Sequence, residues 1–176
     1  MKVRVVWTGR KAPFLYPLSP EPRTAVLARC FRTSGNVRVF PQGWCKEAAA
    51  FRPATIAGSK AQLTALLGTR PVSLTHALIV ILRLGEKLVT EGERERFWRA
   101  FGVPMFEQIV DGSGHLLASE CEAHAGLHVD AAEVELKTFE LEGYRLDETP
   151  CGCGRKSPRL RAAGQTDLDR VAAYAR

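Results

Sequence analysis

The residues best suited to chemistry in this 176-residue chain are soft metal ligands gathered in two places. Cys121 and His128 form the first group, and Cys151 and Cys153 form a Cys-Gly-Cys motif in the second. Structural zinc sites use four thiolate or imidazole ligands in a tetrahedron. We therefore predict that these four residues bind one zinc ion. Such a closed ligand set leaves no open position, so the metal would stabilise the fold and would not activate water.

Three alternatives to this zinc site stay open. The sequence predicts a hairpin with strands over 115–121 and 127–137, which would place Cys121 directly opposite His128. His124 lies in the turn between the strands and could replace His128 as a ligand. In a second alternative no metal binds: Cys121 is a buried hairpin residue and the Cys-x-Cys motif is a reduced, exposed loop. In a third, these residues serve redox chemistry or bind another metal.

The middle of the chain has the pattern of an α/β domain. The apolar run over 74–84 is typical of a strand buried on both faces of a parallel sheet. Capping boxes at Ser59 and Thr90 predict helices that end at Gly68 and Gly102. A further strand over 103–110 completes a strand–helix–strand unit. We predict an α/β core with an antiparallel hairpin that carries the metal site.

The remaining segments complete a three-part organisation. We expect a strand over 3–7, an extended proline-rich arm over 13–22, and a short helix over 24–31. The predicted parts are a basic, proline-rich N-terminal arm with partial core (1–58), the α/β core with the zinc hairpin (59–165), and a C-terminal helix (166–176).

Charge is distributed unevenly along the chain. Residues 1–60 contain eleven Lys and Arg against two acidic residues, whereas residues 61–150 contain eight against fifteen. A basic half favours contact with nucleic acid, a nucleotide or an acidic protein. The basic residues are scattered singly and no predicted helix carries a basic stripe, so we do not expect nucleic acid as the partner. The longest uncharged apolar run, 76–82, is too short to cross a bilayer, and we expect a cytoplasmic protein without a membrane partner.

Several short motifs together resemble a known family. They are Phe101-Gly-Val-Pro-Met-Phe-Glu107, Leu116-Leu-Ala-Ser-Glu-Cys121, Gly126-Leu-His128 and Cys151-x-Cys153-Gly-Arg155. The combination is similar to the phenylacetate–CoA ligase branch of the adenylate-forming (AMP-binding) enzymes, over residues 78–169. Some members of that branch have a Cys/His/Cys/Cys zinc site, which agrees with the ligand set proposed above.

The resemblance implies ATP-dependent formation of an acyl adenylate, followed by thioester formation with CoA. It also implies a site for ATP or AMP. Glu86 matches the glutamate of the adenine-contacting motif, and Asp147 matches the aspartate that binds the ribose hydroxyls. Asp111 falls within the motif that helps to hold magnesium, although the tyrosine and glutamate of that motif are missing.

Other parts of the family pattern have no counterpart in this sequence. The phosphate loop is incomplete at Thr33-Ser34-Gly35, and the small C-terminal domain with the catalytic lysine is not matched. Because adenylation depends on electrostatic stabilisation of the phosphates, we expect a truncated, degenerate relative with no catalytic residues of its own.

The expected role is that of a zinc-stabilised accessory subunit that binds a protein partner or forms a homo-oligomer, with a nucleotide or acyl-CoA as a further ligand. One alternative is a minimal acyl-adenylating or acyl-CoA ligase component that a second chain completes. The other is a zinc-containing nucleic-acid-binding protein.

Overall fold

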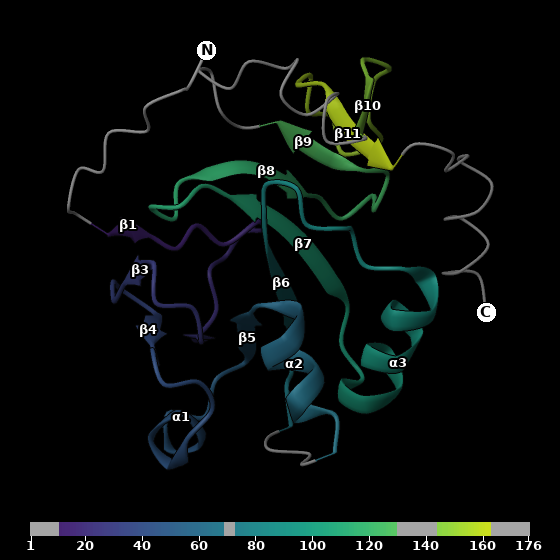
Figure 1. Cartoon of the computed structure of the whole chain (residues 1–176). Coiled ribbons are helices and arrows are strands. Elements are labelled where there is room, and N and C mark those ends of the chain that lie inside the picture. The colour runs from purple at the N-terminus through teal and green to yellow at the C-terminus, as the bar shows by residue number, and fades with distance from the viewer. Residues whose placement is uncertain (1–10, 69–72, 130–143, 163–176) are drawn as a thin grey trace.

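A computed structural model describes residues 11–68, 73–129 and 144–162. The main sheet has nine strands in the order β10-β11-β9-β8-β7-β6-β5-β2-β4, and β1 pairs with β3 in a separate two-stranded sheet (Figure 1). In chain order the elements are β1 (Ala12–Pro13), β2 (Thr24–Val26), β3 (Phe31–Arg32), β4 (Val37–Val39), α1 (Lys46–Ala50), β5 (Thr55–Gly58), α2 (Lys60–Leu66), β6 (Ala77–Arg83), α3 (Glu91–Phe101), β7 (Met105–Val110), β8 (Leu116–Glu120), β9 (Leu127–Val129), β10 (Tyr144–Asp147) and β11 (Arg159–Ala162).

The half of the main sheet from β4 to β7 is parallel. Apolar side chains of β6 alternate between the two faces of the sheet: Leu78 and Leu82 enter one core cluster, and Ile79 and Ile81 enter the other. All four are at most 4% exposed. The prediction of a strand buried on both faces is therefore confirmed, and the fold is the expected α/β arrangement.

Helices α2 and α3 cover one face of this parallel half (Figure 1). Both begin with the predicted capping boxes, in which Ser59 pairs with Gln62 and Thr90 pairs with Glu93. Helix α3 ends at Gly102, which has φ +67° and so needs the left-handed backbone conformation that glycine adopts readily. The predicted helix boundaries thus agree closely with the structure.

The proline-rich arm packs on the opposite face. Phe14 is 2% exposed and belongs to the second core cluster. The Gln108 side chain donates to the Leu15 carbonyl at 2.8 Å, and Arg155 donates to the Pro17 carbonyl at 3.2 Å. An extended segment without helix therefore supplies a layer that covers this face of the sheet.

The predicted helix over 24–31 is wrong. Residues Thr24–Val26 form strand β2, which is fully buried between β4 and β5. Pairing on both sides satisfies the backbone, so tertiary context overrides a weak local preference for helix. The predicted strand over 3–7, the outer part of the predicted strand over 127–137, and the predicted C-terminal helix lie outside the described residues.

From β7 onward the sheet becomes antiparallel, through β8, β9, β11 and β10. Leu127, Leu146 and Leu160 face the same core as α3. The neighbouring positions His128, Arg159 and Asp147 pair with one another and lie on the opposite face. This antiparallel end positions the metal-ligand candidates. Among the described helices, none is long and apolar enough to cross a membrane.

Candidate metal centre

Strands β8 and β9 bring the first two candidate ligands to one face of the antiparallel end. His128 lies on β9 opposite Ser119, so the predicted register, with Cys121 directly across from His128, is wrong by two residues. Cys121 follows β8 directly and belongs to the turn between Glu120 and Leu127, within which the His124 N–H donates to the Cys121 carbonyl at 2.9 Å. A shift of two residues keeps a side chain on the same face. Cys121 therefore still reaches His128 diagonally.

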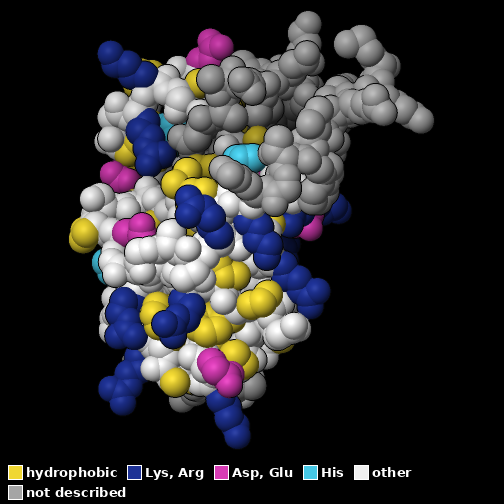
Figure 2. All heavy atoms as spheres, turned by 90° about the vertical axis from the view of Figure 1, so that its left-hand side faces the viewer, with side chains coloured by type: hydrophobic (Ala, Val, Ile, Leu, Met, Phe, Trp, Pro, Cys, Tyr) yellow, Lys and Arg dark blue, Asp and Glu magenta, His cyan; other side chains and the backbone are white. Residues whose placement is uncertain are grey.

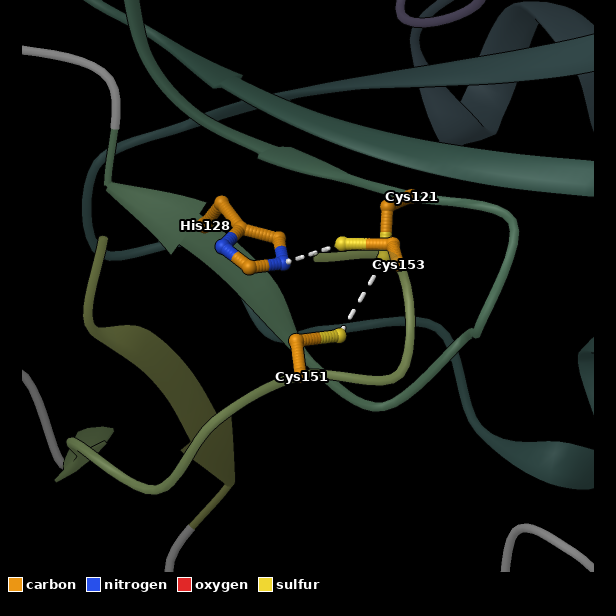
Figure 3. A group of neighbouring side chains, drawn as sticks. All are labelled: Cys121, His128, Cys151 and Cys153. Carbon is orange, nitrogen blue, oxygen red and sulfur yellow. Dashed lines mark hydrogen bonds between the residues drawn. The ribbon is translucent and has the colours of Figure 1, made fainter. Parts of the chain in front are cut away.

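The structure brings all four predicted ligand residues together (Figure 3). Their donor atoms all lie within 4.8 Å of one another. The Cys121 and Cys151 sulfurs are 3.7 Å apart, and the Cys153 sulfur lies 3.3 Å from Nε2 of His128. In a tetrahedral zinc site with Zn–S bonds of about 2.3 Å, two sulfurs lie roughly 3.8 Å apart. The spacing of these atoms therefore suits a tetrahedral metal ion.

A tight turn between β10 and β11 presents the two remaining thiols. The Gly154 N–H donates to the Cys151 carbonyl at 3.0 Å, and Gly154 has φ +83°. Glycine adopts this left-handed conformation readily, which explains why a glycine follows Cys153. The Arg155 N–H points at the Cys153 sulfur at 3.5 Å, and a donor in that position stabilises thiolate charge.

Hydrogen bonds at Nδ1, the ring nitrogen that faces away from the cysteines, fix the orientation of the His128 ring. Nδ1 lies 3.2 Å from the Ser157 carbonyl oxygen and 3.1 Å from the Ser157 hydroxyl. A proton on Nδ1 can be donated to that carbonyl, which leaves the lone pair of Nε2 directed at the cysteines. Metal-binding histidines are commonly oriented by such a second contact. His128 itself is fully buried.

Two of the thiols differ in acidity. Burial raises the pKa of Cys121 to about 12, and the neighbouring thiols of Cys151 and Cys153 add to this effect. Burial alone would also raise the pKa of Cys151, but the backbone N–H of Cys153 and other hydrogen bonds outweigh it and lower the value. A metal ion must therefore displace a proton from Cys121, so its affinity is expected to fall at low pH.

His124, the alternative ligand, points to a different set of partners. Its Nδ1 lies 3.2 Å from a carboxylate oxygen of Glu120, and its ring stacks on Phe106 at 4.8 Å. His124 also has φ +49°, which is unusual for a residue other than glycine. Among the described residues the candidate cluster contains His128 and not His124.

A buried charge network includes Glu120, the residue before Cys121, and the sequence interpretation missed it. Arg94 of α3 forms ion pairs with Glu107 of β7 and Glu120 of β8. Both carboxylates are fully buried, and Arg94 is 6% exposed. Glu120 also accepts the Glu107 N–H at 3.0 Å. The signal available in the sequence was an acidic residue inside the apolar strand over 103–110, because a buried charge requires a partner.

The three candidate nucleotide residues occupy separate local structures. Glu86 accepts the Arg83 N–H at 3.0 Å. It also lines an open depression of about 790 Å³ beside α2. Asp111 accepts the N–H groups of Ser113 and His115 at 2.8 and 2.9 Å and lies 3.0 Å from Nδ1 of His115.

Asp147, the third candidate, is held by two arginines. Its carboxylate lies 2.8 Å from Arg159 and 2.6 Å from Arg161, and it accepts both the N–H and the hydroxyl of Thr149. Within residues 11–68, 73–129 and 144–162, no hydrogen bond or ion pair joins any two of Glu86, Asp111 and Asp147. The structure therefore does not assemble them into one polar cluster.

Comparison with known proteins gives a fold and no closer relation. No protein-family model matches the sequence, and no curated protein matches it. One similar solved structure is an open conformation of 2-hydroxyisobutyryl-CoA ligase in complex with 2-HIB-AMP and CoA. It is 14% identical, with a TM-score of 0.52 over 78% of this chain and 43% of the ligase chain. This protein therefore has the fold of part of an adenylate-forming acyl-CoA ligase. It spans less than half the length of that ligase chain.

Proposed function

We propose that the protein is a zinc-stabilised relative of phenylacetate–CoA ligase that acts as a binding or accessory subunit and does not adenylate by itself. The observation that carries this proposal is the cluster of Cys121, His128, Cys151 and Cys153, with four donor atoms within 4.8 Å. Three thiolates and one imidazole form a soft ligand set that suits zinc.

The metal's contribution in this proposal is structural. A zinc ion bound by these residues would join the end of β8, strand β9 and the turn before β11 in one small unit. All four coordination positions would be filled by protein, so no position remains for water or substrate. Ser157 would hold the His128 ring in place, and Arg155 would hold the Cys153 sulfur.

The accessory role is supported by the state of the candidate nucleotide residues. The carboxylates of Glu86, Asp111 and Asp147 each bond to groups close to them in the fold. Phosphate transfer chemistry needs cations and donors that converge on one ligand. No such convergence involves these three residues in the described part of the chain, which favours binding without adenylation.

The first test is metal content and thermal melting of the purified protein. We expect about one zinc per chain and a lower melting temperature after chelation, because a metal that binds only the folded state stabilises it. Melting is then repeated with ATP, AMP and an aryl-CoA. An unchanged melting temperature with a chelator, together with absence of bound metal, would contradict the structural zinc.

A second candidate function is an acyl-adenylating component that another chain completes. The ligase with the similar fold was solved with an acyl adenylate and CoA, and Glu86 and Lys87 line an open depression in this chain. A rise in melting temperature with ATP or AMP would favour this candidate. ATP–pyrophosphate exchange with aryl acids, measured with and without a co-purified partner, would then decide between the two.

A further inference from the structure

One edge of the molecule carries exposed positive charge. Residues 11–58 contain seven Lys and Arg, all exposed, against two acidic residues, Glu21 and Glu47. The seven, which we term the basic edge, are Lys11, Arg23, Arg29, Arg32, Arg38, Lys46 and Arg52. They belong to or flank β1 to β4 and α1, and in Figure 2 the dark-blue Lys and Arg side chains on this side lie among yellow hydrophobic ones.

Neutral groups hold three arginines of the basic edge in place. The guanidinium carbons of Arg23 and Arg38 lie 4.7 and 5.1 Å from the centre of the Phe51 ring. Arg29 donates to the Pro41 carbonyl at 2.8 Å. Within the described residues, no carboxylate forms an ion pair with any of the seven. The side chains of Arg23, Arg29 and Arg38 are thus oriented while their charge stays uncompensated, which lowers the entropic cost of binding an anion.

The backbone at this edge is closed to strand addition. β4 is the outermost strand of the main sheet. The Val37 N–H donates to the Ser34 carbonyl at 2.8 Å, and the Val39 N–H donates to the Thr33 hydroxyl at 3.2 Å. An extended peptide that pairs with a sheet edge needs free N–H groups. A partner at the basic edge must therefore be recognised by side chains.

The aromatic and apolar surroundings of the basic edge favour a protein partner over nucleic acid. Five of the seven residues are arginine, which pairs with carboxylates and phosphates alike through two parallel hydrogen bonds. The Phe51 ring already contacts two guanidinium groups, so it offers less surface for stacking a nucleic-acid base. Half-buried Val39 and Trp44 add apolar surface, and protein interfaces are enriched in arginine and aromatic residues.

We infer that the basic edge binds an acidic segment of a partner protein, one in which carboxylates alternate with apolar residues. The inference rests on the proposed accessory role and specifies its partner chemistry. The surface is separate from the metal centre, which is formed by residues beyond 120. Failure of one proposal can therefore be told apart from failure of the other.

The test uses fluorescence anisotropy with two probes of matched net charge, a labelled glutamate–leucine peptide and a labelled oligothymidylate. We expect the full chain to bind the peptide more tightly at equal ionic strength. The variant Arg23→Gln/Arg38→Gln should weaken peptide binding about tenfold, because two charge-assisted contacts are lost. The matched control Arg96→Gln/Arg99→Gln removes the same charge from α3, where both residues are exposed, and should change binding less than about twofold.

Three outcomes would overturn the inference: no peptide binding, equal loss in the control variant, or tighter binding of oligothymidylate. The last of these would favour a nucleic-acid partner instead. Zinc content is measured on each variant and should equal that of the unmodified protein. Weaker peptide binding by a variant that keeps its zinc would then be an effect of the basic edge. Absence of zinc from a protein that still binds the peptide would contradict only the metal proposal.

Discussion

The two ends of the nine-stranded sheet are stabilised by different kinds of interaction. The parallel half has apolar side chains on both faces, covered by α2 and α3 on one side and by the proline-rich arm on the other. The antiparallel end has an apolar layer on one face only. Its other face carries the candidate metal centre and the ion pairs of Asp147 with Arg159 and Arg161.

This difference has a physical consequence. Apolar burial is non-directional and roughly proportional to the area removed from water, so the cost of a substitution in the parallel half follows the apolar area and volume that it removes. Metal coordination and buried ion pairs depend on a few atoms, and removal of one partner leaves the others uncompensated. We therefore expect the antiparallel end to respond sharply to metal, pH and single polar substitutions, and the parallel half to respond mainly to loss of volume.

The largest effect should follow loss of a metal ligand. Cys121→Ser should lower the free energy of unfolding by at least about 5 kcal/mol, because loss of a bound metal is among the most destabilising single changes. Hydrogen exchange should show loss of protection in β8, β9 and β11 while β5 and β6 stay protected. Cys45→Ser, at a half-buried cysteine in the N-terminal part, should keep its zinc. Uniform loss of protection across the sheet would show that the two ends unfold as one unit.

The junction of the two ends should be the next most sensitive place. Arg94→Met leaves Glu107 and Glu120 buried without their guanidinium partner, and we expect a loss of about 4 kcal/mol in unfolding free energy. Urea denaturation gives the value. Arg96→Met on the same helix is exposed and should change stability by less than about 0.5 kcal/mol. Similar losses in both variants would mean that helix propensity and not the buried network is responsible.

A volume change tests the parallel half. Leu78→Ala removes a fully buried side chain from β6 and should cost about 3 kcal/mol through lost apolar burial and the remaining cavity. Zinc content should stay the same, since Leu78 lies outside the centre. If this variant lost its metal, the parallel half and the antiparallel end would not respond independently to substitution.

The same division explains how much the sequence could predict. Long apolar runs and capping boxes depend on local chemistry, so β6, β7, α2 and α3 were predictable. The four clustered residues were found from ligand type and spacing, and only the register was wrong. That error arose because the turn after Cys121 depends on the left-handed His124 and on Gly126, where a Cβ would lie 2.8 Å from the Leu160 carbonyl oxygen.

Contacts between distant segments could not be predicted in the same way. The ion pairs of Arg94 join a helix to two strands, and nothing in their spacing identifies the partners. Strand β2 was assigned to a helix because its three residues carry little periodic signal. Its identity comes from pairing with β4 and β5, which is a property of the assembled sheet.

The smallest expected effect concerns Asp147 and depends on pH. Burial alone would raise the pKa of this carboxyl group, but hydrogen bonds from Thr149 and the two neighbouring arginines outweigh it and lower the pKa. An aspartate with a lowered pKa in the folded state contributes stability above its unfolded value of about 3.9 and loses that contribution as pH falls through the folded value. Asp147→Asn should therefore cost about 1.5 kcal/mol at pH 7.

The difference between Asp147→Asn and the unmodified protein should shrink as pH falls below about 3.9, because the carboxyl group of the unfolded chain then binds protons before the native one, whose pKa is lowered. Urea titrations across this pH range measure it. Leu78→Ala serves as the control, because its cost involves no titrating group and should stay nearly constant with pH. A pH-independent cost for Asp147→Asn would mean that the residue stabilises the antiparallel end through shape and neutral hydrogen bonds, and the electrostatic contrast between the two ends would then rest on the metal centre and Arg94 alone.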